Sequence, residues 1–539
     1  AAAGGGLGPL PACAASEAGL DGRALEDHRG RVAQQITLGL FPGAAECVLA
    51  PDRVAYLDTQ GCTDLSAQTP VNSKTLFRCF SMTKPVTAVA AMRLVEMGKI
   101  ALDDPVAKYI PSFAKCRVVR KEARDDSAVD AEHLEPLRRP PTLRHLLTHT
   151  SGLAYGPDRY VASEKLKSKN ADEESYAALS QAVDDGRVRS LARFCDQLAA
   201  LPLRFQPGTE YLYSHGVDVV GRVIEVVSGM RLDVFLEVHV FGPLGMAHTS
   251  FSVPRGRIGV LATMYKAAKV ARATRAGRAW ASGARGADPF GVSLQRIDGA
   301  RPQDSNWCGK QGILAGGGMI GTLPRGGLLS CLQDMALFCN MLMKGGQTLS
   351  GDAYLTRRTV SSLWCDWLQL RCVRAERRPG SPITMPGWSN GPSVGWSPLG
   401  HVRRRDGCLF MGGWSTSWAI YPKWQLATLV LHQSLIWFTV PAWCERRDEL
   451  DGVVEAAKRR RGRARVGRGG TARKAQATQG AKDTRGARGA AASRRPLAAR
   501  MGRRTRAAEA GARKDVARKR RAAPRAAALA WRPSKRARG

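Results

Sequence analysis

The sequence lacks several features that define large protein classes. Its 13 cysteines include no Cys-x-x-Cys pair, so they match neither a zinc-ligand set nor a small disulfide framework. No uninterrupted apolar run reaches about 18 residues, so no transmembrane helix is expected. No targeting signal is recognisable in residues 1–16. Scattered free thiols are typical of a reducing compartment, which favours a cytoplasmic location.

Acidic residues are scarce as well. The chain has 82 Lys and Arg against 46 Asp and Glu, a net charge of +36. Residues 456–539 hold +26 of this charge, because they contain 29 Lys and Arg and only three Asp and Glu. Such a segment cannot bury a core, and its basic runs can attract phosphate groups. We expect residues 449–539 to be a disordered basic tail, for which nucleic-acid binding, nuclear targeting and no selected role all stay open.

The rest of the chain has the composition of a globular protein, with 44% hydrophobic residues overall. Residues 1–25 are rich in Gly, Ala and Pro and are expected to be disordered. A short helix is predicted over 26–35, followed by a hairpin of strands 46–50 and 53–57 around Pro51-Asp52. Near the other end, residues 334–346 predict a helix, and residues 410–421 and 426–433 predict two strands joined by a Pro-Lys turn.

A serine and a lysine three residues apart open the most apolar helix of the sequence. Pro85 suits a first helical turn, and the apolar run from Val86 to Met97 predicts a helix that is buried on most sides. On such a helix Ser81 and Lys84 lie on one face. A desolvated lysine has a lowered pKa and can accept a proton from a serine hydroxyl. The helix N-terminus also favours developing negative charge beside Ser81.

The Ser-x-x-Lys spacing alone is a weak signal. The chain contains a second copy, Ser112 to Lys115, which runs into a charged segment that cannot bury its lysine. We interpret this second copy as a chance match. The significance of Ser81 therefore depends on the other motifs of the chain.

Two histidines four residues apart, His145 and His149, lie in the stretch Leu143 to Leu153. Such spacing can bind zinc, but no Glu follows His145 as it would in His-Glu-x-x-His. We therefore favour a structural helix end at this place. Residues 154–204 are helical and polar in pattern, and we expect them to cover the site as a variable lid.

A tyrosine-bearing turn follows, in which Pro207-Gly208 leads through Tyr211 and Tyr213 to an apolar helix. A tyrosine anion near a lysine ammonium can accept the serine proton and pass it to a leaving group. Either tyrosine can equally be an ordinary packing residue, and the spacing from the helix favours Tyr213 as the functional one. His215 is a candidate for tuning the base or contacting a substrate.

Two other patterns are less informative. Gly387-Trp388-Ser389-Asn390-Gly391 satisfies the nucleophile-elbow pattern, but prolines surround it, so we interpret it as a loop. Gly316 to Gly318 lacks the Gly-Lys-Ser or Gly-Lys-Thr of a phosphate-binding loop, and close backbone packing is the better interpretation.

Taken together, the segments resemble the serine β-lactamase-related family, which includes class C β-lactamases, family VIII carboxylesterases and penicillin-binding-protein-like proteins. The resemblance covers about residues 30–435, and the motifs occur in the order of the family. They are Ser81-Met82-Thr83-Lys84, His149-Thr150-Ser151-Gly152-Leu153, the Tyr213 turn, and Gly412-Gly413 before the last strands.

The resemblance implies an α+β fold of the β-lactamase/transpeptidase type. Its antiparallel sheet would be flanked by helices, with a largely helical second subdomain. The family domain would span 26–448, with the sheet subdomain formed by 26–113 and 310–448 and the helical subdomain by 114–309.

The resemblance also implies the residues of the site. Ser81 would be acylated, Lys84 and Tyr213 would share proton transfer, and the backbone N–H groups of Ser81 and Trp414 would form the oxyanion hole. His215, Met411, Gly412 and Gly413 would line the substrate site, and no metal or organic cofactor is implied. Met411 replaces a usual polar or aromatic residue, which favours a neutral ester or amide over a β-lactam carboxylate.

Two functions follow as hypotheses. The first is a serine hydrolase or acyltransferase acting on a small-molecule ester or amide. The second is a catalytically silent scaffold of the same family, tethered to nucleic acid or the nucleus by its basic tail.

Overall fold

A computed structural model of the chain describes ten ranges of residues: 7–123, 130–155, 171–253, 259–269, 293–297, 327–368, 393–403, 407–412, 416–435 and 450–457. The chain divides into two compact units, residues 1–461 and 462–539. Every described residue lies in the first unit, which the following paragraphs concern.

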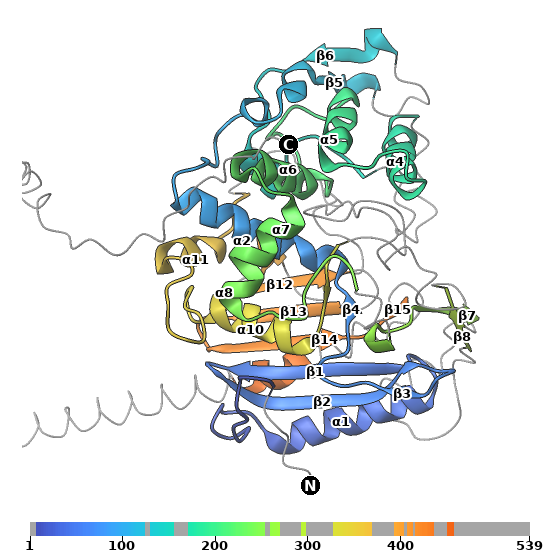
Figure 1. Cartoon of the computed structure of the whole chain (residues 1–539), viewed down its shortest axis with the longest axis vertical. Coiled ribbons are helices and arrows are strands. Elements are labelled where there is room, and N and C mark those ends of the chain that lie inside the picture. The colour runs from blue at the N-terminus through green and yellow to red at the C-terminus, as the bar shows by residue number, and fades with distance from the viewer. Residues whose placement is uncertain are drawn as a thin grey trace, which may run out of the picture. The chain divides into compact units, whose positions relative to one another are not determined.

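An eight-stranded antiparallel sheet forms the middle of this unit (Figure 1). Strands from the two ends of the unit meet inside the sheet, where Ala45 pairs with Leu431. This arrangement confirms the predicted sheet, the hairpin around Pro51-Asp52, and the two strands joined by the Pro-Lys turn. In spatial order the strands are β10 (Ser393–Ser397), β11 (Gly400–Arg403), β12 (Gly407–Gly412), β13 (Thr416–Tyr421), β14 (Leu426–Leu431), β1 (Gly43–Ala50), β2 (Arg53–Asp64) and β3 (Thr69–Pro70).

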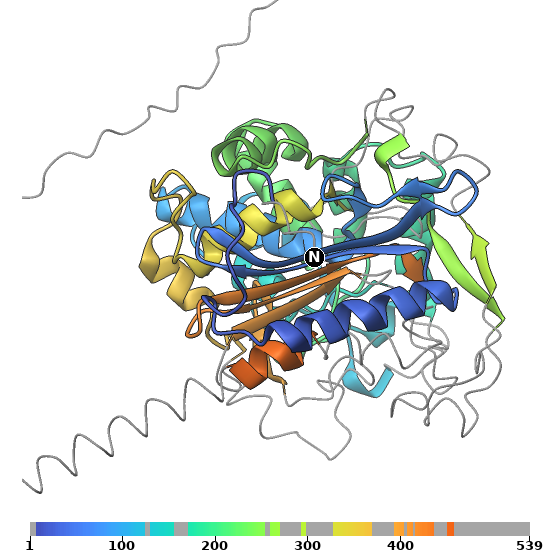
Figure 2. The same ribbon diagram turned by 90° about the horizontal axis from the view of Figure 1, so that it is seen from below.

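The sheet has a hydrophobic core on each face, because side chains of successive strand residues point to opposite sides. Along β1, Ala45, Cys47 and Leu49 belong to the main core, whereas Ala44 and Val48 belong to a second core. All eight residues of β1 are therefore buried. Helices cover both faces: α1 (Gly22–Thr37) lies along one, and α2 (Thr83–Glu96) and α10 (Leu332–Met343) lie along the other (Figures 1 and 2).

The remaining helices and short strands lie mostly between β4 and α10 in the sequence. Two short antiparallel sheets pair β4 (Phe77–Arg78) with β9 (Leu329–Ser330) and β5 (Arg117–Val119) with β6 (Leu134–Pro136), and a third joins β15 (Ser434–Leu435), β7 (Tyr265–Lys269) and β8 (Ser293–Arg296). The helices are α3 (Leu143–Leu147), α4 (Ala171–Asp184), α5 (Leu191–Ala200), α6 (Gly216–Ser228), α7 (Leu232–Leu236), α8 (Gly242–Leu244) and α11 (Arg357–Leu363). The predicted subdomain boundaries stay a prediction.

Two segments predicted to be disordered are packed instead. Leu7 and Leu10 are fully buried in the main core, and the backbone at Cys13 and Val54 is joined by a hydrogen bond of 2.9 Å. At the other end, residues 450–457 form a helix whose Leu450 and Val454 are fully buried in the second core beside α1 (Figure 2). The prediction of disorder rested on composition alone. Composition cannot show that a few apolar residues become buried through contacts with distant parts of the chain.

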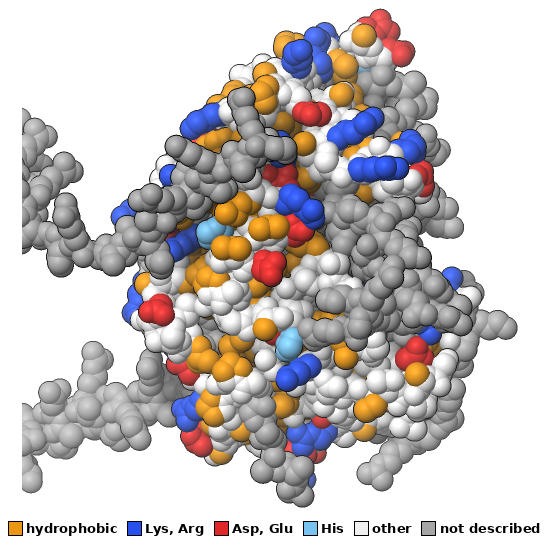
Figure 3. Space-filling view, in the orientation of Figure 1, with side chains coloured by type: hydrophobic (Ala, Val, Ile, Leu, Met, Phe, Trp, Pro, Cys, Tyr) orange, Lys and Arg blue, Asp and Glu red, His pale blue; other side chains and the backbone are white. Residues whose placement is uncertain are grey.

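One face of this unit carries mixed charges. On the face drawn in Figure 3, the described Lys and Arg side chains are scattered among acidic and hydrophobic ones rather than gathered in one patch. None of the helices in the described ranges combines the length and the hydrophobicity needed to span a bilayer.

The helix of residues 450–457 generates a stability prediction. Replacing Leu450 and Val454 together by Ala should lower the free energy of unfolding by about 4 kcal/mol, because both side chains are fully buried. Urea denaturation followed by fluorescence measures the change.

Gly452→Ala is the matched control. A Cβ at Gly452 would meet no atom within 4 Å, so this helical substitution should be neutral or stabilising by up to about 1 kcal/mol. Equal stability of the double variant and the control would show that the helix does not pack on the sheet.

Candidate active site

Ser81 lies on a strained turn between β4 and α2. The turn Phe80–Met82 is a single 3-10 turn, and α2 begins directly after it at Thr83. Phe80 has a φ of 46°, a left-handed conformation that is costly for a bulky side chain. Such strain persists only where the surroundings over-determine it. The turn therefore presents Ser81 at the N-terminus of a 14-residue helix, where the macrodipole favours negative charge.

A distant segment holds this turn in place. The backbone N–H of Cys79 donates to Leu328 (2.8 Å), and the N–H of Leu328 donates to the Thr83 hydroxyl (2.8 Å). Gly327 has a φ of 80°, and a Cβ there would approach the Thr83 Oγ1 to 2.3 Å. Only glycine fits so close to the Ser81 turn at that backbone angle.

Lys84 is within reach of the Ser81 hydroxyl, as its position on the helix predicts. The Nζ of Lys84 lies 3.3 Å from the Oγ of Ser81, and the two residues are only 1% and 5% exposed. Burial lowers the pKa of Lys84 to about 7, and the Asp218 carboxylate opposes this shift. A substantial fraction of the lysine is thus neutral near pH 7, which is the state that can accept a proton.

Aromatic rings surround the lysine amine. Its Nζ lies 4.7 Å from the ring centroid of Tyr213 and 5.4 Å from that of Tyr155. The structure therefore brings Ser81, Lys84 and Tyr213 together, as predicted. Tyr155 was missed, because it follows the His-Thr-Ser-Gly-Leu stretch by two residues and no spacing rule singles it out.

His215 occupies a buried position beside Tyr155. Its Nδ1 lies 2.9 Å from an Asp218 carboxylate oxygen, its Nε2 lies 3.5 Å from the Ser180 hydroxyl, and the residue is 1% exposed. The ring packs on Tyr155 with a centroid distance of 4.2 Å. The structure does not support the predicted substrate contact of His215, because each of its ring nitrogens already lies within hydrogen-bond distance of a protein atom. The Asp218 carboxylate of this pair opposes the lowering of the Lys84 pKa.

The two histidines of the Leu143 to Leu153 stretch have separate roles. His145 forms a capping box with Thr142 at the start of α3. His149 lies after the end of that helix, with its ring 4.4 Å from that of Tyr213. Within the described ranges, no group of three or more His, Cys, Asp and Glu side chains is placed to hold a metal. The capping box at His145 agrees with the interpretation of this stretch as a structural helix end.

The second Ser-x-x-Lys copy is not a site. The Ser112 hydroxyl donates to the Asp196 carboxylate (2.8 Å), and Lys115 is exposed to solvent. The expectation of a chance match is confirmed, because nothing desolvates this lysine.

Strand β12 runs beside the Ser81 turn. Met411 and Gly412 are its last two residues, and they pair with Ser417 and Thr416 of β13. Gly413 and Trp414, the other residues predicted on this side, lie outside the described residues, as do the patterns at 316–318 and 387–391. The strand is therefore where the resemblance predicts it.

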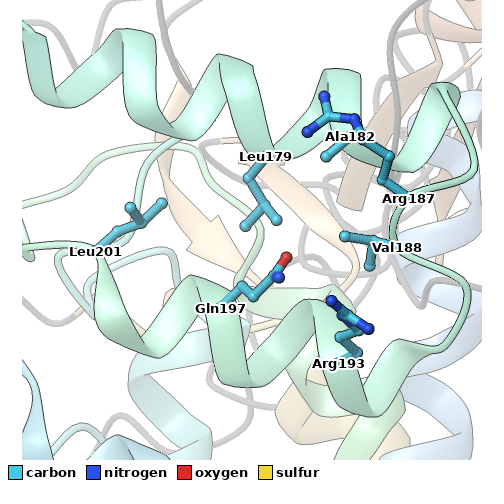
Figure 4. A pocket seen from close by; sticks show the side chains of 7 residues that line it. All are labelled: Leu179, Ala182, Arg187, Val188, Arg193, Gln197 and Leu201. Carbon is cyan, nitrogen blue, oxygen red and sulfur yellow. The ribbon is translucent and has the colours of Figure 1, made fainter.

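A cavity of about 580 Å³ lies elsewhere, between α4 and α5 (Figure 4). Leu179, Val188 and Leu201 give it an apolar lining, and Arg187 and Arg193 reach into it. Its lining includes none of the residues around Ser81, so it is separate from the site described above.

The comparison with family models identifies this arrangement. The model of the Beta-lactamase family matches residues 29–443, which is most of the chain. The chain belongs to the beta-lactamase family. The predicted β-lactamase/transpeptidase-like fold is thereby confirmed.

Relatives within the beta-lactamase family include enzymes named as esterases. The chain is 35% identical to esterase EstB of Burkholderia gladioli over 217 residues, 39% of this chain and 47% of EstB. It is 33% identical to the lovastatin esterase of Penicillium rubens over 172 residues, 32% of this chain and 38% of that enzyme. The chain thus spans about half or less of the length of these curated relatives.

Solved structures of the beta-lactamase type show the same fold. Simvastatin synthase (LovD) from Aspergillus terreus has a TM-score of 0.59 at 20% identity, covering 80% of this chain and 98% of LovD. EstCE1, described as a hydrolase with promiscuous acyltransferase activity, has a TM-score of 0.56 at 21% identity, covering 79% and 98%. Sequence identities this low support a similarity of fold and nothing further.

The lowered pKa of Lys84 predicts a pH dependence. If neutral Lys84 is the base, kcat/KM should rise with pH through about 7 and then level off. Asp218→Asn should move this rise to lower pH by roughly half a unit to one unit, because the carboxylate favours the charged ammonium. Stopped-flow hydrolysis of p-nitrophenyl butyrate between pH 5 and 9 measures both curves. A shift of the rise to higher pH in the variant would contradict this assignment.

The same burial predicts a stability effect. Unfolding restores Lys84 toward its ordinary pKa of 10.5, so between pH 7 and 10.5 the unfolded chain binds more protons than the folded chain. The wild type should therefore gain stability relative to Lys84→Met as pH rises, by roughly 3 kcal/mol from pH 7 to 9.5. Urea denaturation of both proteins at the two pH values tests this difference. A constant difference would mean that the amine is not desolvated.

Proposed function

We propose that the protein is a serine hydrolase that forms an acyl-enzyme on Ser81 with a small-molecule ester or amide. The observation that carries the proposal is the 3.3 Å approach of the Lys84 amine to the Ser81 hydroxyl in a buried setting. A serine hydroxyl needs an adjacent base, and a lysine serves only when desolvation has lowered its pKa. Lys84 meets both requirements.

Acylation starts with the transfer of a proton. Neutral Lys84 accepts the proton of the Ser81 hydroxyl while Oγ attacks the carbonyl carbon of the substrate. The carbonyl oxygen gains negative charge, which the N–H groups of Ser81 and Trp414 stabilise, and each such donor is worth on the order of 3 kcal/mol. Tyr213, over whose ring the Lys84 amine lies, shares the proton and returns it to the leaving group.

Deacylation regenerates the serine. Water, activated by the same basic groups, attacks the acyl carbon, and Ser81 recovers its proton as the ester bond breaks. An alcohol in place of water would receive the acyl group instead. Esterases among the partial relatives favour hydrolysis as the main reaction.

The surroundings of Lys84 favour neutral substrates with an apolar acyl group. Tyr155, Tyr213 and Trp396 form a continuous set of rings, with centroid distances of 5.6 Å between the two tyrosines and 5.8 Å between Tyr213 and Trp396. Aromatic faces bind apolar groups well. Met411 in place of a polar residue on β12 adds to this preference, and a neutral ester is the substrate class we propose.

The catalytically silent scaffold is the competing hypothesis. Under this hypothesis Ser81, Lys84 and Tyr213 form their cluster but catalyse no reaction. A buried lysine beside a strained serine turn is costly for stability, and such cost is typical of functional sites. The nucleic-acid-binding role of residues 449–539 belongs to this second hypothesis and stays a proposal.

Active-site labelling tests the proposed function. A fluorophosphonate should add one covalent adduct to the wild type, measured by intact-mass spectrometry, and p-nitrophenyl butyrate should be hydrolysed. Ser81→Ala should abolish both, with turnover lowered by at least about 1,000-fold, while its thermal midpoint stays close to that of the wild type.

Ser112→Ala is the matched control, because it removes the serine of the second Ser-x-x-Lys copy and should leave labelling and turnover intact. Labelling that survives in Ser81→Ala, or a folded wild type that neither reacts nor hydrolyses, would reject the proposal and favour the silent scaffold.

A further inference from the structure

His149 has a left-handed backbone conformation, which is uncommon among residues other than glycine. Its φ is 56°, and it is one of five non-glycine residues in the described ranges with a positive φ. Asn and Gly adopt this left-handed region more readily than His. The residue is 1% exposed, and its Nε2 has no hydrogen-bond partner among the described residues. A strained and incompletely bonded histidine calls for a reason beyond stability.

The contacts of His149 lie on both sides of Tyr213. Its carbonyl oxygen accepts the N–H of Leu212 (2.9 Å), and its Nδ1 accepts the N–H of Ser214 (3.2 Å). Its ring also packs on the Tyr213 ring, at 4.4 Å between centroids. One residue therefore holds the peptide groups before and after Tyr213 as well as the aromatic ring itself.

These contacts determine the protonation state of His149. A backbone N–H can only donate, so Nδ1 must offer a lone pair to Ser214, and the proton of a neutral ring must be on Nε2. Burial lowers the pKa of His149 well below its ordinary value, and the charges of Lys84 on α2 and His401 on β11 lower it further. A charged ring would carry a proton on Nδ1 and would break the bond to Ser214.

We propose that His149 is a positioning residue for Tyr213. As a neutral, Nε2-protonated imidazole it fixes the backbone on both sides of Tyr213 and keeps the phenol ring over the Lys84 amine. The inference rests on the proposed function, because the benefit of a fixed Tyr213 appears in proton transfer. Misplacement of a group by about 1 Å can cost about 100-fold in rate.

Two isosteric variants separate this role from simple packing. In His149→Asn the amide oxygen would stand in for Nδ1, and asparagine suits the left-handed backbone, so this variant should keep kcat within about fivefold of the wild type. His149→Gln places its amide near Nε2 instead and offers no acceptor to Ser214. It should lower kcat for p-nitrophenyl butyrate by about 10- to 100-fold with KM changed less than about threefold.

A double-mutant cycle with Tyr213→Phe shows whether His149 acts through Tyr213. In the Tyr213→Phe background, His149→Gln should cost less than about threefold, because the group that it positions is already inactive. An undiminished effect of His149→Gln in that background would overturn the inference. A His149→Asn variant as slow as His149→Gln would overturn it as well.

Nitrogen NMR on the unmodified protein provides a measurement that needs no activity. With ¹⁵N-labelled histidine, the His149 signals, assigned by their loss in His149→Asn, should show a neutral ring with Nε2 protonated from pH 8.5 down to 5.5. A charged ring or a proton on Nδ1 in that range would overturn the inference. Failure of the proposed function would appear separately, as absent Ser81-dependent labelling and turnover in a protein whose His149 keeps this tautomer.

Discussion

The desolvation of one amine is the constraint on which the site depends. Lys84 is on a helix that is buried along nearly its whole length, and the lysine itself is only 1% exposed. In water the amine would be charged and unable to accept a proton from a hydroxyl. The burial that lowers its pKa is also unfavourable for the fold, and the sheet and helices around α2 must offset that cost.

The elements around α2 come from widely separated parts of the chain. Residues 327–328 hold the Ser81 turn, His149 holds the Tyr213 turn, and β12 reaches the Ser81 turn from the C-terminal strands. Asp218 contributes a charge that moderates the lowering of the Lys84 pKa. The site is thus assembled from segments that lie far apart in the chain, and backbone hydrogen bonds hold the Ser81 and Tyr213 turns.

Local signals in the sequence account for much of this arrangement. Helical spacing predicts the Ser81–Lys84 contact, since residues three apart share a face, and the apolar run after Pro85 predicts the burial of α2. The alternation of β1 between two cores could not be predicted, because a strand buried on both faces shows no polar periodicity. The packing of Leu7 and Leu10 was missed for a related reason, since two apolar residues in a Gly-rich segment become buried only after the sheet exists.

Other site residues leave no local signal. Tyr155 and His149 belong to the site because the turn that carries Tyr213 packs beside them. The residues next to them in the sequence give no indication of that contact. The left-handed conformation of Phe80 has no local signal in the sequence either, and the segment that contacts its turn, 327–328, is far away in the chain. The pairing of His215 with Asp218 is the exception, because an i, i+3 spacing at the start of a predicted helix could have shown it.

The pairing of β1 with β14 has a consequence for the order of events during biosynthesis. The face on which α2 packs is completed by residues 426–431, about 340 residues after Lys84 leaves the ribosome. Until then the lysine stays hydrated, and its pKa stays close to the ordinary value. Contacts so distant in sequence form slowly, since a long loop must close first. The burial of Lys84 is therefore completed by strands that are synthesised long after α2.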